Sequence, residues 1–339
     1  NGKILELDSI RDKELHVPEE LWKTLEWISQ YYITPLGQVL KAAVPNTFLD
    51  TYNPKHVQFV QITKEGIQQL EYGKTKNPAQ KRILSALSSI SEPVKVSSLT
   101  DCASSPHAVC KSLARKGWVH ILYQPKITDP FEIMAPGKSQ DITLSAEQQS
   151  VFNTIINTKN GFHPLLLHGV TGSGKTEVYL KLAQQAVGDE KSVLVLVPEI
   201  SLTPQVATRF RRAFGNRVAL WHSRMTRAEK GWTWQKLKKG EYSVVVGARS
   251  AIFAPIKNLG LIIIDEEQEA SYKQENPVPR YHARDVAMVR GKYANATVLL
   301  TSATPSLESY YNALQKKFTL LKLTERYGTS VYPAVEVVD

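Results

Sequence analysis

Cysteine is scarce in this chain of 339 residues, which carries only Cys102 and Cys110. Two thiols cannot supply the four ligands of a structural zinc site, and they do not suggest a disulfide scaffold. No run of about 18 apolar residues occurs, so no transmembrane helix is predicted. A basic start followed by an apolar stretch is also missing, which argues against a secretory signal. We therefore expect a reduced, cytoplasmic chain.

Acidic residues are fewer than basic ones, because 32 Asp and Glu oppose 42 Lys and Arg and leave a net charge of +10. A basic balance favours a polyanionic partner, although many soluble proteins share it. Apolar residues make up 42% and charged residues 22%, which excludes wholesale disorder and a coiled coil. The length allows two or three domains of roughly 100–200 residues each.

The two ends of the sequence have the appearance of positions inside a longer protein. It opens on Asn1 rather than Met, and the residues before Asp339 read as a strand broken off in its course. We therefore expect a fragment of a longer protein.

The first region, residues 1–75, is predicted to be helical with extended pieces. Leu21, Leu25, Ile28 and Tyr32 recur at helical spacing and form one apolar face. The aromatic side chains of this region could stack on bases, but packing in a small core is the more common role.

The second region, residues 76–130, is predicted to contain three short helices followed by a β hairpin. This order is typical of a winged helix, whose third helix often enters a DNA groove. A spacer or protein-interaction module would show the same pattern. The third helix lacks a dense basic face, so the sequence does not decide between this alternative and DNA contact. Residues 131–142, with Pro136 and Gly137, are predicted to be a linker.

From residue 143 to 339, apolar runs of strand length alternate with helical segments. Strands are predicted at 165–167, 193–197, 244–246, 261–264 and 297–300, and helices at 175–186, 203–214, 226–238 and 283–293. Continuous apolar strands separated by helices indicate a parallel sheet covered on both faces. The predicted fold class is therefore α/β.

A complete phosphate-binding loop, G-x-x-x-x-G-K-[ST], occupies residues 169–176 between a predicted strand and a predicted helix. Its glycines let backbone amides curl around phosphate oxygens at a helix N-terminus. Lys175 is expected to reach the β- and γ-phosphates, and Thr176 is expected to hold Mg²⁺. The predicted nucleotide-binding residues of this loop are Gly169, Thr171, Gly172, Gly174, Lys175 and Thr176.

Carboxylates follow the buried strand at 261–264. Ligands of open α/β sheets bind beyond the carboxyl ends of the strands, so Asp265 is placed to bind Mg²⁺ and Glu266 to activate water. Lys175, Asp265 and Glu266 are the predicted catalytic residues. Thr301-Ser302-Ala303-Thr304 follows the next strand, and its hydroxyls can bond the acidic segment, although an ordinary Ser/Thr turn reads the same.

The motifs together resemble the PriA family of bacterial replication-restart helicases, also called primosomal protein N′. They are GVTGSGKTE at 169–177, LVPEISLTPQ at 196–205, VGARSAIFAP at 246–255, DEEQEASYKQ at 265–274, RYHARD at 280–285 and TSATPS at 301–306. A further match, YYITPLGQVLKAAVP at 31–45, extends the resemblance over essentially the whole chain. It implies the C-terminal part of a 3′-end DNA-binding domain at 1–75, a winged helix at 76–130 and a P-loop, RecA-like helicase lobe at 143–339.

The resemblance implies an ATP-dependent 3′-to-5′ DNA helicase that acts in replication fork restart and primosome assembly. The implied cofactors are ATP and Mg²⁺, and the implied partners are forked and single-stranded DNA, primosome proteins and single-strand-binding protein. The family's zinc-binding insertion and second motor lobe would follow Asp339. The fragment alone is therefore expected to be weakly active or inactive.

The resemblance also assigns roles by matched position. Gln148 corresponds to the residue that contacts adenine. Segments along the single-strand path contain Glu199, Ser201, Thr203, His222, Ser223, Arg249 and Ser250. The predicted DNA-coupling residues are Arg249, Ser250, Tyr272, Lys273, Arg280, Tyr281 and Arg284. The tyrosines can stack on bases and the cations can contact phosphates, whereas the alternative is an ordinary charged loop.

One position departs from the family. Gln268 stands where the family usually has His, which retains hydrogen bonding but loses a titratable ring. Two alternatives stay open. One is another superfamily-two DNA translocase, and the other is a winged-helix DNA-binding regulator switched by a nucleotide.

Overall fold

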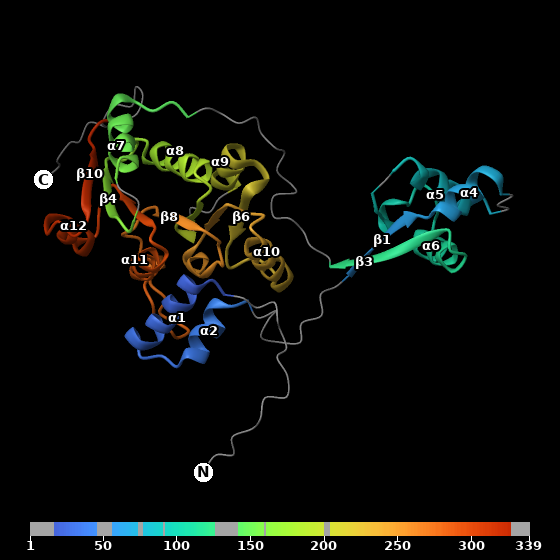
Figure 1. Cartoon of the computed structure of the whole chain (residues 1–339), viewed down its shortest axis with the longest axis horizontal. Helices are drawn as coiled ribbons and strands as arrows, with labels where there is room; N and C mark the ends of the chain where they lie inside the picture. Colours follow the sequence, from blue (N-terminus) through green and yellow to red (C-terminus); the bar gives the residue numbers. More distant parts are fainter. Residues whose placement is uncertain are drawn as a thin grey trace, which may run out of the picture. The chain divides into compact units, whose positions relative to one another are not determined.

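The computed structural model describes residues 17–45, 56–73, 77–90, 92–125, 142–158, 161–199 and 204–326. These ranges divide into two compact units, one with 17–45 and the ranges from 142 onward, the other with the ranges from 56 to 125 (Figure 1). Residues 131–141 of the predicted linker at 131–142 lie outside the described residues, as do the predicted DNA-path residues Ser201 and Thr203.

The smaller unit contains a three-stranded antiparallel sheet in the order β2-β1-β3. Its strands are β1 (His56–Ile62), β2 (Val94–Lys95) and β3 (Val119–Pro125), and its helices are α4 (Lys64–Tyr72), α5 (Pro78–Ser88), η1 (Val96–Ser98) and α6 (Pro106–Arg115). Because β1 pairs along its length with β3 and also with β2, it is the central strand. The domain boundary predicted at residue 75 is therefore corrected, since residues 56–73 belong to this unit.

The larger unit is built on a parallel sheet, in which the described strands follow the order β10-β4-β9-β8-β5-β7-β6. The strands are β4 (Pro164–Gly169), β5 (Ser192–Leu196), β6 (Val218–Trp221), β7 (Val244–Gly247), β8 (Leu259–Ile264), β9 (Thr297–Ser302) and β10 (Thr319–Leu323). All five predicted strands are present. The two that the prediction missed, β6 and β10, are the edges of the sheet.

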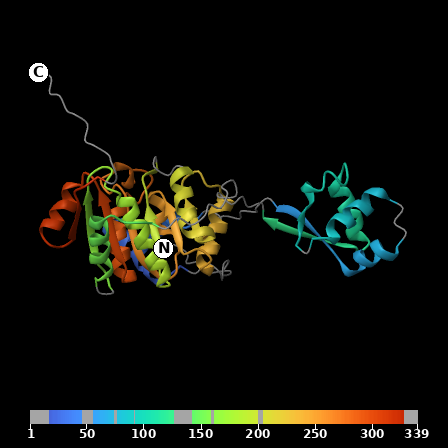
Figure 2. The ribbon, with the colours of Figure 1, turned by 90° about the horizontal axis from the view of Figure 1, so that it is seen from above.

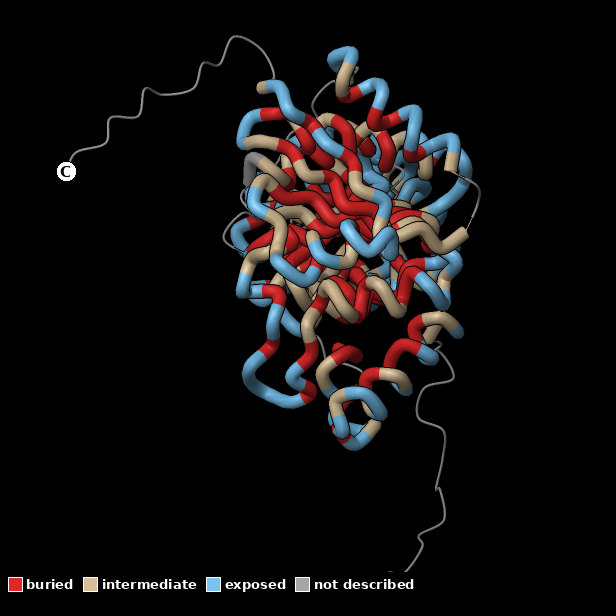
Figure 3. Tube along the Cα trace, turned by 90° about the vertical axis from the view of Figure 1, so that its left-hand side faces the viewer, coloured by how far each residue is buried: buried red, intermediate tan, exposed pale blue. Residues whose placement is uncertain are grey.

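Helices cover both faces of this sheet (Figure 2). One face carries α7 (Ala146–Ile156), α8 (Lys175–Gly188) and α9 (Pro204–Phe214); the other carries α10 (Arg227–Lys239), α11 (Ala283–Ala294) and α12 (Leu307–Leu314). Successive residues of a strand supply the two cores, since Val193 and Val195 face one and Leu194 and Leu196 face the other. Figure 3 shows the resulting buried interior beneath an exposed surface. No helix in the described ranges is both long and apolar enough to span a bilayer.

The helices α1 (Glu19–Tyr31) and α2 (Leu36–Ala43) form a hairpin that belongs to the larger unit. The predicted apolar face of α1, including Leu21, Leu25 and Ile28, is fully buried in the same core as α11. Arg290 of α11 is 0% exposed; its guanidinium donates to the carbonyl oxygens of Ile252 and Ala254 and pairs with Glu20 of α1 at 3.4 Å. The hairpin is thus fixed to the sheet domain by apolar packing and by a buried ion pair.

Candidate nucleotide-binding and DNA-coupling sites

The phosphate-binding loop runs from the end of β4 to the start of α8. Gly172 and Gly174 have φ angles of +80° and +76°, which favour glycine because a Cβ atom strains this backbone region. At Gly169, an added Cβ would lie 2.6 Å from Ser173 Oγ, so this position has no room for a side chain. The loop is therefore shaped by its glycines in the way a phosphate cradle requires.

Lys175 is the first residue of α8 and its ammonium group is largely buried in the loop. Its Nζ donates to the carbonyl oxygen of Gly169 at 2.8 Å. Burial lowers the pKa of Lys175, and the carboxylates of Glu266 and Asp265 oppose this change. The hydroxyl of Ser173, also buried, has no hydrogen-bond partner among the described residues. A phosphate group would give both side chains an acceptor, so the loop fits a nucleotide.

Asp265 follows β8 and is held by two hydroxyl groups. Thr301 Oγ1 donates to its Oδ1 at 2.6 Å, and Tyr179 Oη donates to its Oδ2 at 3.1 Å. Burial raises the pKa of Asp265, while the hydrogen bond from Thr301 lowers it. Burial also raises the pKa of Tyr179 far above its usual range, which keeps this hydroxyl a donor. Asp265 and Thr176 are oxygen ligands of the kind Mg²⁺ takes together with nucleotide phosphates.

Glu266 is connected to the Thr301–Thr304 segment through Gln268. The amide of Gln268 donates from Nε2 to Glu266 Oε2 at 2.9 Å, and its Oε1 accepts from Ser302 Oγ at 2.6 Å. Gln268 thus bridges the acidic segment and the hydroxyl segment by hydrogen bonds. The backbone of Glu266 has a φ of +48°, a conformation that non-glycine residues rarely adopt.

Glu267, the third acidic residue of this segment, is 0% exposed. Its carboxylate accepts hydrogen bonds from the backbone and hydroxyl of Ser306, from the hydroxyl of Ser309 and from Arg284 Nη1 at 3.1 Å. These contacts tie the end of β8 to α11 and α12. The prediction that Arg284 contacts DNA phosphate is not supported, since this guanidinium is committed to a buried carboxylate.

Gln148 lies at the start of α7 and is 1% exposed. Its Oε1 accepts from the backbone of Ser145, and its Nε2 donates to the carbonyl oxygen of Ser173 at 2.8 Å. Both ends of the amide are therefore engaged by backbone groups. This geometry does not support the predicted base contact. Gln148 instead holds the phosphate loop through its hydrogen bond to Ser173.

The predicted DNA-coupling tyrosines are core residues, with Tyr272 0% and Tyr281 1% exposed. Tyr272 Oη donates to the backbone carbonyl of Asp265 at 2.6 Å, and the Tyr281 ring packs edge-on against Phe253 at 5.0 Å between centroids. Rings in these positions cannot stack on bases, so that part of the prediction is corrected. Tyr272 still joins the loop to the catalytic segment through its hydroxyl.

The cations of this loop have different environments. Arg249 Nη1 donates to the carbonyl oxygens of Ser271 and Lys273, at 3.1 and 2.8 Å, and so holds the loop in shape. Lys273 and Arg280 are exposed, although Lys273 Nζ donates to the carbonyl oxygen of Arg280 at 2.7 Å. Of the residues predicted along the single-strand path, Ser223 donates a hydrogen bond to Glu199, and burial lowers the pKa of His222.

Two supporting side chains, Tyr179 and Glu267, were not predicted. Tyr179 lies one helical turn after Lys175, which puts both on the face of α8 that meets β8. That spacing was the one available signal for Tyr179. The sequence contains no signal for Glu267, because a third acidic residue after a strand gives the same sequence pattern whether its side chain is exposed or buried. In the described ranges no cluster of three or more His, Cys, Asp or Glu side chains is arranged to hold a metal ion.

Comparisons with known proteins identify the families that this chain matches. Residues 145–313 match the DEAD/DEAH box helicase family, and residues 1–45 match the 3′ DNA-binding domain of PriA proteins. The larger unit therefore has the fold and the motifs of a helicase-type ATP-binding lobe.

The chain is 40% identical over 333 residues to the replication restart protein PriA of Chlamydia muridarum, covering 95% of this chain and 43% of that protein. It is 42% identical over 294 residues to PriA of Bacillus subtilis, covering 85% and 36%. Among solved structures, RecG bound to a three-way DNA junction has a TM-score of 0.43 and 24% identity over 56% of this chain and 25% of that one. The chain belongs to the PriA family of replication restart proteins, and it spans less than half the length of these relatives.

Proposed function

We propose that the protein is an ATP-dependent 3′-to-5′ DNA helicase that acts in replication fork restart. The observation that carries the proposal is the set of contacts between the phosphate loop, the acidic segment and the hydroxyl segment. Tyr179 joins α8 to Asp265, Thr301 joins β9 to Asp265, and Gln268 joins Glu266 to Ser302. Such a network lets a change at the γ-phosphate reach neighbouring strands, as a motor requires.

In this proposal, Lys175 neutralises the β- and γ-phosphates, and Thr176 and Asp265 hold the metal ion. Glu266 orients the attacking water and accepts its proton. Mg²⁺, when bound, neutralises the charge that develops on the phosphate oxygens. Gln268 fixes the Glu266 carboxylate by a hydrogen bond from its side-chain amide. Unlike the imidazole of a histidine, this amide does not titrate, so the hydrogen bond does not depend on pH through Gln268.

The partners follow from the family rather than from the site. Forked and single-stranded DNA are the proposed substrates, with primosome proteins and single-strand-binding protein as partners in the cytoplasm. A zinc site is proposed only for protein sequence outside this chain. The exposed Lys273 and Arg280 are the coupling-loop cations proposed to contact DNA phosphates.

The test is ATP hydrolysis by the full-length protein with and without forked DNA. We expect strong stimulation by DNA and its loss in Lys175→Ala. Glu266→Gln should slow hydrolysis by about 10²–10⁴-fold while nucleotide binding persists. Hydrolysis that ignores DNA would overturn the helicase proposal and favour a nucleotide-switched DNA-binding regulator. Full turnover by Glu266→Gln would remove the role given to that carboxylate.

A further inference from the structure

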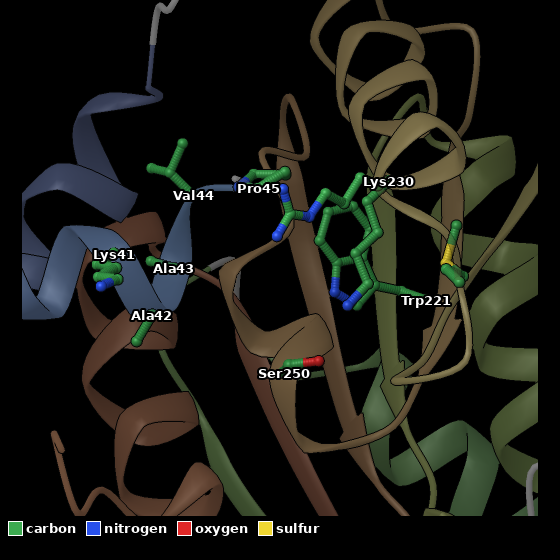
Figure 4. Close-up of a pocket in the computed structure, with 10 residues that line it drawn as sticks. Lys41, Ala42, Ala43, Val44, Pro45, Trp221, Lys230 and Ser250 are labelled. Atoms are coloured by element: carbon green, nitrogen blue, oxygen red, sulfur yellow. The ribbon is translucent and has the colours of Figure 1, made fainter. Parts of the chain in front are cut away.

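The N-terminal hairpin meets the sheet domain differently at the end of α2 and at the turn between its helices. At the end of α2, a cavity of about 240 Å³ separates residues 41–45 from Trp221 and Lys230 (Figure 4). At the turn, by contrast, Tyr32 contacts the coupling loop, residues 270–284: its Oη accepts a hydrogen bond from the backbone N–H of His282 at 3.1 Å. Tyr32 is therefore a point at which the hairpin holds this loop.

On the side of the hairpin, Tyr32 is fixed by its backbone and by neighbouring aromatic rings. It directly follows α1, and its N–H donates to the carbonyl oxygen of Ile28 at 3.0 Å. Its ring meets Trp27 and Tyr31 edge-on, at 6.0 and 5.0 Å between centroids. Burial raises the pKa of Tyr32, so its hydroxyl stays protonated at neutral pH. A neutral, packed side chain of this kind can hold its partner in one position.

On the side of the loop, His282 is the start of two routes of contacts to the acidic segment. In the first route, His282 forms an antiparallel β-bridge with Lys273. The residue before it, Tyr272, donates from Oη to the backbone carbonyl of Asp265 at 2.6 Å. Lys273 also lies over the Tyr32 ring, with its Nζ 5.6 Å from the ring centroid. A displacement of His282 therefore acts on the residue pair that reaches Asp265.

The second route passes through the first turn of α11. His282 caps this helix, because its Nδ1 accepts from the backbone N–H of Arg284 at 3.2 Å. Arg284 in turn pairs with the buried Glu267 at 3.1 Å. Glu267 directly follows Glu266, the carboxylate proposed to activate water. Both routes thus begin at the residue that Tyr32 holds, and they end beside the groups proposed to bind metal and water.

We propose that Tyr32 is a positioning residue for DNA-stimulated ATP hydrolysis, whose hydroxyl fixes the coupling loop against the acidic segment. The inference rests on the proposed function, because it presumes that DNA stimulates hydrolysis. Its new content is that the N-terminal hairpin takes part in this coupling through one hydroxyl group that does not touch nucleotide. Lys273, a cation proposed to contact DNA, belongs to the strand that pairs with His282. DNA bound at Lys273 therefore acts on a loop whose opposite strand is held by Tyr32.

The first test is hydrogen exchange at single-residue resolution in the 339-residue chain. Tyr32→Phe keeps the ring and removes the hydroxyl, so the amide of His282 should exchange about 2- to 10-fold faster. Tyr31→Phe is the matched control, because it removes a hydroxyl from the adjoining ring, which is 63% exposed. Unchanged exchange at His282 in Tyr32→Phe, or equal acceleration in both variants, would overturn the proposal. Acceleration throughout α1 would also contradict it, because the hairpin packing rather than one contact would then be lost.

The second test compares ATP hydrolysis by the full-length protein with and without saturating forked DNA. In Tyr32→Phe, the ratio of the two rates should fall at least about threefold, while the ATP concentration for half-maximal rate stays within about twofold. Tyr31→Phe should leave both quantities unchanged. A merely structural role for Tyr32 would lower the two rates alike and leave their ratio at the wild-type value, which would contradict the proposal.

A double-mutant cycle tests the route through the loop. If Tyr32 acts partly through Tyr272, the loss of stimulation in the double variant Tyr32→Phe with Tyr272→Phe should be smaller than the product of the two single losses. Losses that multiply would mean independent action and would contradict that route.

The same measurements separate the failure of this inference from the failure of the proposed function. If the wild-type full-length protein hydrolyses ATP equally fast with and without DNA, the proposed function fails and the coupling role of Tyr32 fails with it. If DNA stimulates the wild type and Tyr32→Phe to the same degree, only the inference about Tyr32 fails.

Discussion

At the scale of single residues, Asp265 shows how the site trades stability for chemistry. Burial raises its pKa, so the charged form is disfavoured in the folded chain. A carboxyl group of this kind stabilises the fold most below its unfolded pKa of about 3.9, and that contribution is lost as pH rises through the folded pKa. At neutral pH the ionised side chain therefore costs stability in the absence of nucleotide.

We predict that Asp265→Asn stabilises the nucleotide-free chain at pH 7 by about 0.5–2 kcal/mol while removing metal binding. The gain should shrink as pH falls towards 4, because the wild-type carboxyl is then protonated. Denaturant unfolding at the two pH values measures both effects. Asp189→Asn, an exposed change, should stay within about 0.5 kcal/mol. A variant less stable than wild type at pH 7 would contradict the argument.

The Arg284–Glu267 pair yields a prediction that separates a structural role from DNA contact. Arg284→Met leaves the buried Glu267 carboxylate without its cation and should destabilise the fold by about 3–5 kcal/mol. Arg280→Met, on the exposed loop, should cost less than about 0.5 kcal/mol. Urea unfolding of both variants is the measurement. Glu267→Gln should partly restore the stability of Arg284→Met, since the second change removes the unpaired buried charge. Equal stability of Arg284→Met and Arg280→Met would contradict the structural role given to Arg284.

Tyr179 provides a test of the metal-binding segment itself. Tyr179→Phe removes the hydroxyl that donates to Asp265 Oδ2 and should cost about 1 kcal/mol of stability. In the full-length protein it should also raise the Mg²⁺ concentration needed for half-maximal ATP hydrolysis, because Asp265 loses one of its two positioning hydroxyls. Tyr311→Phe, on the exposed surface of α12, is the control. An unchanged Mg²⁺ dependence would remove Tyr179 from the site.

At the scale of elements, the α1–α2 hairpin is held by apolar packing and by the ion pair between Arg290 and Glu20. Glu20→Ala would leave Arg290 without its carboxylate in the core. We expect the amides of α1 to exchange hydrogen about 100-fold faster, corresponding to roughly 3 kcal/mol of local stability, while the central strands stay protected. Glu19→Ala changes a neighbouring, exposed residue of the same helix and should leave exchange unaltered. Uniform acceleration across the unit would show global rather than local opening.

The elements also show which features a sequence can predict. The strands β4, β5, β7, β8 and β9 are covered on both sides and therefore read as continuous apolar runs. The edge strand β10 has exposed residues at Thr319 and Lys322 that interrupt its apolar run. The edge strand β6 is a buried apolar run of four residues like β7, and its pattern does not explain why the prediction missed it. The phosphate loop and Asp265 were predicted because their chemistry depends on sequence-local spacing.

The parts of the site that the sequence misassigned depend on burial. Tyr272 and Tyr281 are surrounded in the sequence by charged residues, which is the same pattern whether the rings face solvent or the core. Gln148 likewise forms contacts with Ser145 and with the distant Ser173, and only the second of these needs the fold. Long-range packing, which no local pattern encodes, decided all three cases.

At the scale of the whole molecule, the smaller unit is predicted to fold without the rest of the chain. It has its own core, which includes Val60, Ile83, Leu84 and Leu113. Residues 52–128 expressed alone should unfold in one cooperative transition and give a dispersed amide NMR spectrum. Residues 76–128 should not fold, because they lack the central strand β1. A folded 76–128 fragment would restore the sequence-based boundary.

The division of the larger unit has a consequence for synthesis on the ribosome. The α1–α2 hairpin is made first, but α11, whose core it shares, follows about 250 residues later. At roughly 5–20 residues per second, the apolar face of α1 waits about 10–50 s for its partner. During that interval the smaller unit is completed and can fold, while the hairpin stays exposed to the cell's chaperones and proteases. Within the described part of the larger unit, the N-terminal helices thus emerge long before the helix against which they pack.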